Sequence, residues 1–182
     1  MAQLKIIVDF EDHVQGRIDA PITLVEYGDY ECPHCGHAYP IVKSLQRQFG
    51  DQMRFIFRNF PLRESHPHAE AAAETAEFAG AQGRFWEMHD ALFENQQRLS
   101  QRVFFELAER LELDARALEQ SLVRGEFRDR VQRDFSGGAR SGVNGTPTFF
   151  INGQRHDGDF ELQTLAAAIE HALPTGRPKK NP

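Results

Sequence analysis

The feature that most constrains the fold of this chain is its single pair of cysteines, Cys32 and Cys35, which are separated by two residues. An apolar, β-branched run at 22–27 precedes the pair, and a stretch at 36–49 with apolar residues at helical spacing follows it. The first pattern is typical of a buried strand and the second of an amphipathic helix. We therefore expect the cysteines at a strand-to-helix turn, a position typical of redox-active dithiols.

The same spacing can also supply two of the four ligands of a structural zinc site. The segment at 32–36, Cys-Pro-His-Cys-Gly, matches half of such a site, but the chain has no other cysteine. His37 is too close in sequence to serve easily as a ligand, and His66 and His68 are the only other paired histidines. Because the sequence offers too few further ligands to complete a zinc site, the dithiol interpretation is favoured and no metal site is expected. A non-catalytic metal-binding or chaperone-like module on the same fold stays the alternative.

Cys32 lies where the helix should begin, and Pro33 takes the first helical position, where a proline costs least. Unpaired N–H groups and the helix dipole favour an anion there, so we expect the pKa of Cys32 to lie well below that of a free thiol. His34 adds a hydrogen-bond donor or a positive charge within reach of this sulfur. Cys35, one turn further in, is expected to be less exposed and to resolve a mixed disulfide by attacking Cys32.

A second informative segment, 145–148 (Gly-Thr-Pro-Thr), leads into another β-type run. A proline at the entrance to a strand is a common place for a cis peptide bond, which would leave the preceding N–H and C=O groups free to pair with an extended peptide. Close to the cysteines, Thr146 and Pro147, together with Pro33, would then form a substrate-binding surface. The alternative is that Pro147 only marks a strand edge.

Glu26 lies in the middle of the run at 22–27, on the strand face that it shares with Gly28. A buried carboxylate is costly unless it has a partner or a task. We interpret Glu26 as the proton acceptor for Cys35 during resolution, with a raised pKa, and a salt bridge to an arginine is the alternative. His89 lies on an apolar helical stripe and is expected to be a hydrogen-bonded core residue.

The order of elements predicts an α/β chain, a thioredoxin-like βαβ…ββα frame that carries an inserted all-helical subdomain. The frame is expected over 1–66 and 140–173, the helical insertion over 67–139 and a disordered tail over 174–182. The patterns predict strands at 5–8 (an edge strand), 22–27, 53–60, 146–151 and 154–157, and helices at 36–49, 67–82, 85–95, 101–111, 115–124, 127–139 and 160–172.

Composition argues against several classes of function. The 21 basic and 27 acidic residues give a net charge of −6, so no nucleic-acid partner is expected. No run of 18 or more apolar residues occurs, so no membrane association is expected. The N-terminus lacks the pattern of a secretory signal, which favours a cytoplasmic location, whereas a processed form would be periplasmic. We expect a monomer or a weak dimer.

Three features together resemble the DsbA-like family of thiol–disulfide oxidoreductases: the strand before the 32–35 motif, the Thr146-Pro147 loop before a strand hairpin, and the helical insertion between them. The resemblance covers about residues 5–172. It implies a thioredoxin fold with an inserted helical domain and an enzyme of the protein dithiol–disulfide oxidoreductase type (EC 1.8). The roles that it implies are Cys32 as the attacking cysteine, Cys35 as the resolving cysteine, His34 as a tuner of the thiolate, a cis Pro147, and Glu26 as the family's buried acid.

The same resemblance implies no cofactor other than the redox-active disulfide between Cys32 and Cys35. The partners would be cysteine-containing protein substrates and a redox-recycling partner, either a thiol reductant or an oxidase. Thr146 stands where the strongest oxidants of the family often carry an apolar residue, and it resembles isomerases and reducing members. The direction of electron flow therefore stays open. A glutathione-dependent enzyme of the same fold is a third hypothesis, against which the intact cysteine pair argues.

Overall fold

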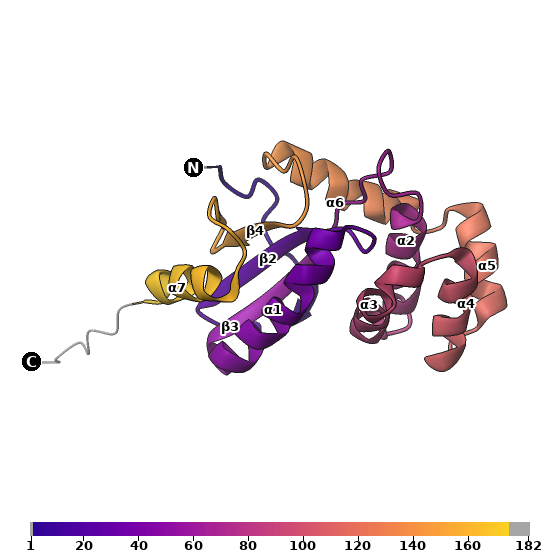
Figure 1. The fold of residues 1–182 in the computed structure, drawn as a ribbon, viewed down its shortest axis with the longest axis horizontal. Helices are drawn as coiled ribbons and strands as arrows, with labels where there is room; N and C mark the ends of the chain where they lie inside the picture. The colour runs from indigo at the N-terminus through magenta and orange to yellow at the C-terminus, as the bar shows by residue number, and fades with distance from the viewer. Residues whose placement is uncertain (1, 175–182) are drawn as a thin grey trace, which may run out of the picture.

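A five-stranded sheet in the order β1-β3-β2-β4-β5 forms the centre of the frame in the computed structural model, which describes residues 2–174 (Figure 1). β2 and β3 pair in parallel, and the three other pairings are antiparallel. The strands are β1 (His13–Gln15), β2 (Ile22–Gly28), β3 (Met53–Asn59), β4 (Thr148–Ile151) and β5 (Gln154–Arg155).

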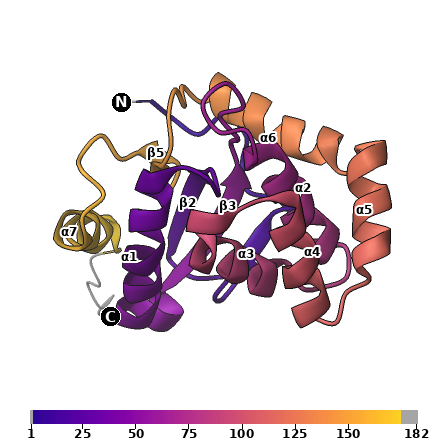
Figure 2. The same ribbon diagram turned by 45° about the vertical axis from the view of Figure 1, so that its right-hand side comes forward.

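The helices divide into those that cover the sheet and those that form the insertion. α1 connects the parallel strands β2 and β3 and lies beside α7, whereas α2 to α5 gather on the far side of the frame (Figures 1 and 2). The predicted α/β class with a helical insertion is therefore confirmed. The α-helices are α1 (Pro33–Phe49), α2 (Ala69–Gly80), α3 (Phe85–Glu94), α4 (Gln101–Arg110), α5 (Ala115–Arg124), α6 (Arg128–Arg140) and α7 (Leu162–Ala172), and the short 3-10 helices are η1 (Gly50–Gln52) and η2 (Gln96–Arg98).

Both faces of β2 are buried, which explains why its sequence reads as a nearly continuous apolar run. Ile22 and Leu24 belong to the larger core, which includes buried residues of α1 and α7 and continues into the insertion. Val25 and Tyr27 point to the opposite face and belong to a smaller core cluster, against which Phe135 of α6 packs. Strand parity therefore places Glu26 on the face of α1, the helix that begins at the cysteine pair.

The ends of two insertion helices are fixed by capping residues. The Ser100 hydroxyl accepts the N–H of Val103 at the start of α4, and the Asp114 carboxylate accepts two N–H groups at the start of α5. Gly125 ends α5 in the left-handed conformation, with φ of 62°, which a glycine adopts at little cost. These local signals explain why the predicted limits of α4 and α5 agree closely with the structure.

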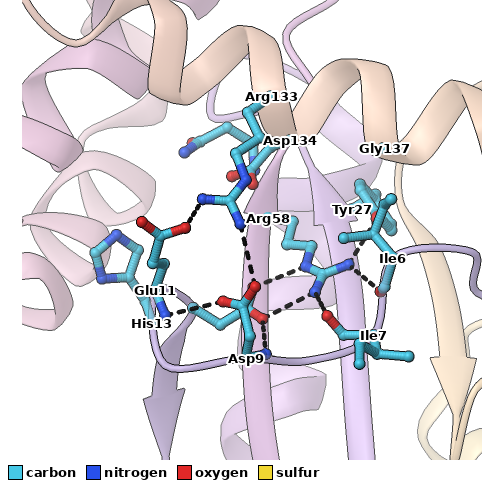
Figure 3. A network of polar contacts seen from close by, with 12 residues as sticks. Ile6, Ile7, Asp9, Glu11, His13, Tyr27, Arg58, Arg133, Asp134 and Gly137 are labelled. Carbon is cyan, nitrogen blue, oxygen red and sulfur yellow. Dashed lines mark hydrogen bonds and ion pairs between the residues drawn. The ribbon is translucent and has the colours of Figure 1, made fainter.

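The prediction of an edge strand at 5–8 is wrong. The outer position next to β3 is taken by β1. The carbonyl groups of Ile6 and Ile7 instead accept N–H groups of the buried Arg58, at 2.9 and 3.2 Å (Figure 3). A buried guanidinium needs acceptors for its donors, and here the N-terminal segment supplies them in place of forming a sheet ladder.

α6 joins the insertion to the frame, because it contacts both α2 and β3. At the end of β3, the Asn59 N–H donates to Asp134 of α6 at 3.0 Å, and the Asn59 side-chain amide donates to Glu77 of α2 at 2.7 Å. No described helix has both the length and the apolar character needed to cross a membrane. Of the expected tail, residues 175–182 lie outside the described residues.

Candidate active site

The cysteine pair lies at the junction of β2 and α1, as predicted. Cys32 is the N-cap residue of α1, with extended φ and ψ of −71° and 121°, and Pro33 is the first residue of the helix. Gly36 N–H donates to the Cys32 carbonyl at 3.1 Å, which is the first hydrogen bond of the helix. Both cysteines are free thiols, so the structure represents the reduced form.

The pKa of Cys32 is lowered to about 5. The largest cause is the hydrogen bond from the Cys35 thiol. Burial acts in the opposite direction, and the Thr146 side chain and the backbone N–H groups of Cys35 and His34 lower the pKa further. The unpaired N–H groups of a helix N-terminus stabilise an anion, so this position favours the thiolate form of Cys32 at neutral pH. The expected direction for Cys32 is therefore reproduced by the site geometry.

The pKa of Cys35 moves the other way, well above the ordinary value of a thiol. Burial is the main cause, and the hydrogen bond to Cys32 and the charges of Glu26 and Cys32 add to it. The Asp29 N–H, which lies 3.4 Å from the Cys35 sulfur, is the contact that lowers this pKa. The two sulfurs thus differ. Cys32, which is 4% exposed, is favoured as a thiolate, whereas the fully buried Cys35 must lose its proton within the core.

Glu26 is 2% exposed, and its neighbours across the sheet are Phe57 and Phe149. Burial, followed by the charge of Cys32, raises the pKa of Glu26 to about 8. Its Oε1 atom is buried and accepts no hydrogen bond from the described residues. The arginine salt bridge considered from the sequence is therefore not formed by the described part of the chain, and the carboxyl group is free to exchange a proton.

Thr146 and Pro147 lie against the dithiol. The peptide bond between them is cis, as predicted. The Cys32 sulfur lies 3.4 Å from the Thr146 carbonyl oxygen, to which it donates a hydrogen bond only while it is a protonated thiol. The Thr146 hydroxyl is buried and has no hydrogen-bond partner among the described residues, and it lies where it can donate to a Cys32 thiolate.

His34 and Pro33 form the exposed rim of the site. The His34 ring lies 6.3 Å from the Phe160 ring in an edge-to-face arrangement. The backbone N–H of His34 helps to lower the pKa of Cys32. The effect expected from its side chain therefore stays a prediction. His89 is buried and pairs with the Tyr30 hydroxyl at 3.1 Å, which confirms that it is a hydrogen-bonded core residue.

No sequence pattern predicts Gln96 in the site, yet this residue of the insertion reaches the active-site loop. Its side-chain amide donates to the carbonyl groups of Tyr30 and Cys32, each at 2.9 Å. A Cβ atom on Gly36 would lie 2.1 Å from the Gln96 side-chain oxygen, so a glycine at 36 permits the approach. A lone glutamine between two helices has no pattern that would reveal this contact.

The described residues contain no group of three or more His, Cys, Asp or Glu side chains that could hold a metal ion. The residues predicted to act together are instead gathered around the two sulfurs. They are Glu26 from β2, Cys32 at the N-cap of α1, Cys35 in the first turn of α1, and Thr146 and Pro147 from the segment before β4.

A comparison with protein families finds that residues 9–171 match the model described as "Thioredoxin". The chain belongs to the thioredoxin family. Its inserted helices place it among the DsbA-like members. Oxidised BdbD from Bacillus subtilis is 26% identical, with a TM-score of 0.80 over 88% of this chain and 91% of that one. A thioredoxin-like oxidoreductase from Silicibacter pomeroyi is also 26% identical, with a TM-score of 0.77 over 90% and 93% of the two chains. The fold and the cysteine pair of this chain are those of a thioredoxin-like oxidoreductase.

Curated relatives carry a different name. The Na(+)/H(+) antiporter NhaA 1 of Salinispora arenicola is 46% identical over 162 residues, which is 89% of this chain but 25% of that protein. The corresponding antiporter of Mycobacterium sp. is 39% identical over 161 residues, or 26% of its length. This chain therefore spans about a quarter of the length of the curated relatives that it matches.

Proposed function

We propose that this protein exchanges disulfides with cysteine-containing protein substrates through the Cys32–Cys35 pair. In the oxidising direction, a substrate thiolate attacks Cys32 of the disulfide and Cys35 leaves as a thiolate, which takes up a proton. A second substrate thiolate then attacks the mixed disulfide, and Cys32 leaves. The substrate loses two electrons and gains a disulfide, and the protein ends with two reduced cysteines.

The observation that carries this proposal is that the surroundings shift the pKa values of the two cysteines in opposite directions. The pKa of Cys32 is about 5, whereas that of Cys35 lies well above its ordinary value. Such a pair has one good nucleophile and leaving group, the slightly exposed Cys32, and one fully buried thiol that reacts only within the molecule. A cysteine pair that served only packing would not need donors from three residues on one sulfur.

The geometry favours the oxidising direction. Each donor that stabilises the Cys32 thiolate stabilises the reduced form relative to the disulfide, which makes the disulfide the stronger oxidant. The Thr146 hydroxyl is one of these donors. Thr146, which leaves the direction open in the sequence, therefore supports oxidation here, because its side chain lowers the pKa of Cys32.

Protein substrates suit the surface beside Cys32 better than a small enclosed ligand does. Pro147, His156 and Phe160 line an open depression of about 160 Å³ next to the active-site loop. Pro33 and His34 on the other side of the sulfur are exposed. An extended segment of a substrate can lie across this rim, with Thr146 and Pro147 beneath it.

The equilibrium redox potential of the Cys32–Cys35 pair against glutathione tests the proposed direction. We expect a value well above the roughly −270 mV of thioredoxin, closer to the roughly −120 to −180 mV of strong protein oxidants. A value at or below that of thioredoxin would overturn the oxidising direction. A high potential would also favour an exported, periplasmic form, and a low potential a cytoplasmic one.

Transfer to a protein substrate needs its own experiment. The oxidised protein should form disulfides in reduced ribonuclease A, one for each Cys32–Cys35 disulfide consumed. In the reverse direction, the Cys35→Ser variant should accumulate a mixed disulfide with oxidised ribonuclease A, because the Cys32 thiolate attacks a substrate disulfide and no Cys35 resolves the product. The Cys32→Ser variant is the matched control and should do neither. If purified protein instead binds stoichiometric zinc and forms no mixed disulfide, the metal-binding alternative replaces this proposal. A redox-recycling partner is part of the proposal and would restore the disulfide after each transfer.

A further inference from the structure

Asp29 lies between β2 and Cys32, and its carboxylate is enclosed by donors. It accepts the N–H groups of Glu31 and Leu62 and the ring Nδ1 of His66, each at 2.8 Å. The carboxylate is fully buried, and the His66 side chain is 17% exposed. This arrangement ties the active-site loop to the segment that follows β3.

The main chain of Asp29 contacts both cysteines. Its N–H donates to the Cys35 sulfur at 3.4 Å, and its carbonyl accepts the N–H of Cys32 at 3.2 Å. One peptide segment therefore sets the position of a donor at the resolving sulfur and of the residue that carries the attacking sulfur. Its side chain makes three contacts that prevent this segment from turning.

A buried carboxylate so close to the dithiol would oppose formation of a second thiolate unless its charge were balanced. His66 supplies that balance. Although burial lowers the pKa of His66, the hydrogen bond and charge of Asp29 and the charges of Cys32 and Glu31 outweigh it, and the pKa is raised. The Asp29 N–H can then stabilise a thiolate on Cys35, with the opposing charges of Glu26 and Cys32 facing the same sulfur.

We propose that Asp29 and His66 are positioning residues for the resolving step: their pair holds the Asp29 peptide so that its N–H donates to Cys35 as that sulfur becomes a thiolate. This inference rests on the proposed disulfide exchange and assigns a role to residues outside the Cys-x-x-Cys motif. In the step itself, Cys35 loses its proton to Glu26. The Cys35 thiolate attacks the Cys32 sulfur of a mixed disulfide, the Cys32–Cys35 bond forms, and the bound thiol leaves as its thiolate.

The aromatic disulfide 5,5′-dithiobis(2-nitrobenzoate) separates the two steps, because each releases one coloured thionitrobenzoate. With reduced protein in excess, the first release reports attack by Cys32, and the second, concentration-independent release reports attack by Cys35. Stopped-flow absorbance at pH 5 to 10 gives a rate and a pH midpoint for each phase. Hydrogen bonds to a charged group are strong enough for the loss of this donor to slow the second phase by roughly tenfold.

We expect His66→Gln to slow the second phase by roughly fivefold to tenfold at pH 7 and to move its pH midpoint upward. Asp29→Asn should do both to a larger extent, because it removes the negative charge that pairs with His66 and turns one of the two accepting oxygens into an NH2 group, so that at least one of the three donors loses its acceptor. The first phase should change by less than about twofold, since Cys32, with a pKa of about 5, stays ionised at pH 7 after a small shift.

His68→Gln is the matched control, because His68 donates to the Glu31 carboxylate through its main-chain N–H, which the substitution keeps. It should retain both phases of the unsubstituted protein. Unchanged second phases in His66→Gln and Asp29→Asn would overturn the inference, and so would equal slowing of both phases together with a lower melting temperature. If Asp29→Asn does not fold, His66→Gln decides. If the unsubstituted protein releases no second thionitrobenzoate, the proposed function itself fails and this inference fails with it.

Discussion

Glu26 and Arg58 are buried ionisable residues on the neighbouring strands β2 and β3, and their surroundings differ: Arg58 is fully hydrogen-bonded, whereas Glu26 is not. Arg58 lies on the face of Tyr27, where its five N–H donors are all accepted. The acceptors are both carboxylate oxygens of Asp12, the carbonyl groups of Ile6 and Ile7, and the Tyr27 hydroxyl (Figure 3). Glu26 lies on the other face, and its Oε1 accepts no hydrogen bond from the described residues.

This difference distinguishes the two roles. Arg58 carries a permanent charge that stabilises the fold, whereas Glu26 can gain or lose a proton. Although burial opposes it, the partners Asp12 and Tyr27 raise the pKa of Arg58, so the guanidinium stays charged. Glu26, with a pKa of about 8, is close to the point at which it gains or loses a proton at physiological pH. The carboxyl group of Glu26, without a hydrogen-bond donor at Oε1, can exchange a proton with the dithiol. The fully hydrogen-bonded guanidinium of Arg58 instead holds the N-terminal segment in place.

The largest effect is expected on the dithiol face. Cys32→Ser should lower the rate of disulfide exchange by at least about a thousandfold, because the attacking thiolate is removed. At pH 4, where Cys32 is a neutral thiol in both the folded and the unfolded state, the free energy of unfolding of the reduced protein should change by only about 1 kcal/mol, since serine is close to cysteine in size. Exchange with ribonuclease A and urea unfolding measure the two quantities. A large loss of stability with the rate of exchange retained would mean that Cys32 serves the fold rather than the reaction, which contradicts the account.

Arg58→Met should have the converse outcome. We expect it to lower the free energy of unfolding by about 3–5 kcal/mol, because Asp12 is left as a buried charge without its partner. The folded fraction should keep its rate of disulfide exchange within about threefold. Arg17→Met, which breaks an exposed pair with Asp19, is the control and should leave stability unchanged within error. Equal effects of the two substitutions would contradict a structural role for the buried network.

Glu26 should make stability depend on pH with a defined sign. A carboxyl group whose pKa is raised from 4.5 to about 8 binds more protons in the folded state, so its stabilising contribution is complete below pH 4.5 and is lost as the pH rises toward 8. At pH 7 the loss should amount to about 3 kcal/mol. Urea unfolding at pH 4 to 8 of Cys32→Ser, with and without Glu26→Gln, isolates this slope from that of the thiolate. Parallel curves for the two variants would show that Glu26 is not the source.

The smallest effect is expected on the rate of the resolving step. Glu26→Gln removes the proton acceptor for Cys35, but at pH 7 most of the Glu26 carboxyl groups are already protonated. We therefore expect a slowing of only about tenfold in the second release of thionitrobenzoate, with the first release unchanged. A change in the first release alone would place Glu26 with Cys32 rather than with Cys35.

Local patterns allowed the strand-helix-strand unit, the helical insertion and the places of Cys32, Cys35 and Glu26 to be predicted. In each case the signal lies within a few residues, such as the apolar run of β2 or the proline at the start of α1. The edge strand at 5–8 failed because Arg58, about fifty positions later in the chain, draws the carbonyl groups of that segment away from the sheet.

The contacts of Asp29 with His66 and of Gln96 with Cys32 join residues far apart in the sequence and have no periodic pattern. His66 was visible only as part of a histidine pair, and its partner was one acidic residue among many. Such pairs are determined by how the insertion and the loop after β3 close over the active-site turn. Rules based on residues close together in the sequence cannot predict such long-range contacts.

The ionisation of Cys32 tests the central claim most directly. Alkylation of the reduced protein by iodoacetamide, followed as a function of pH, reports the thiolate of Cys32, because Cys35 is fully buried. The predicted midpoint is about 5, produced by donors from Cys35, Thr146 and the helix N-terminus. A midpoint above about 8, the range of an ordinary thiol, would show that these donors do not act on Cys32 and would contradict the account of the site.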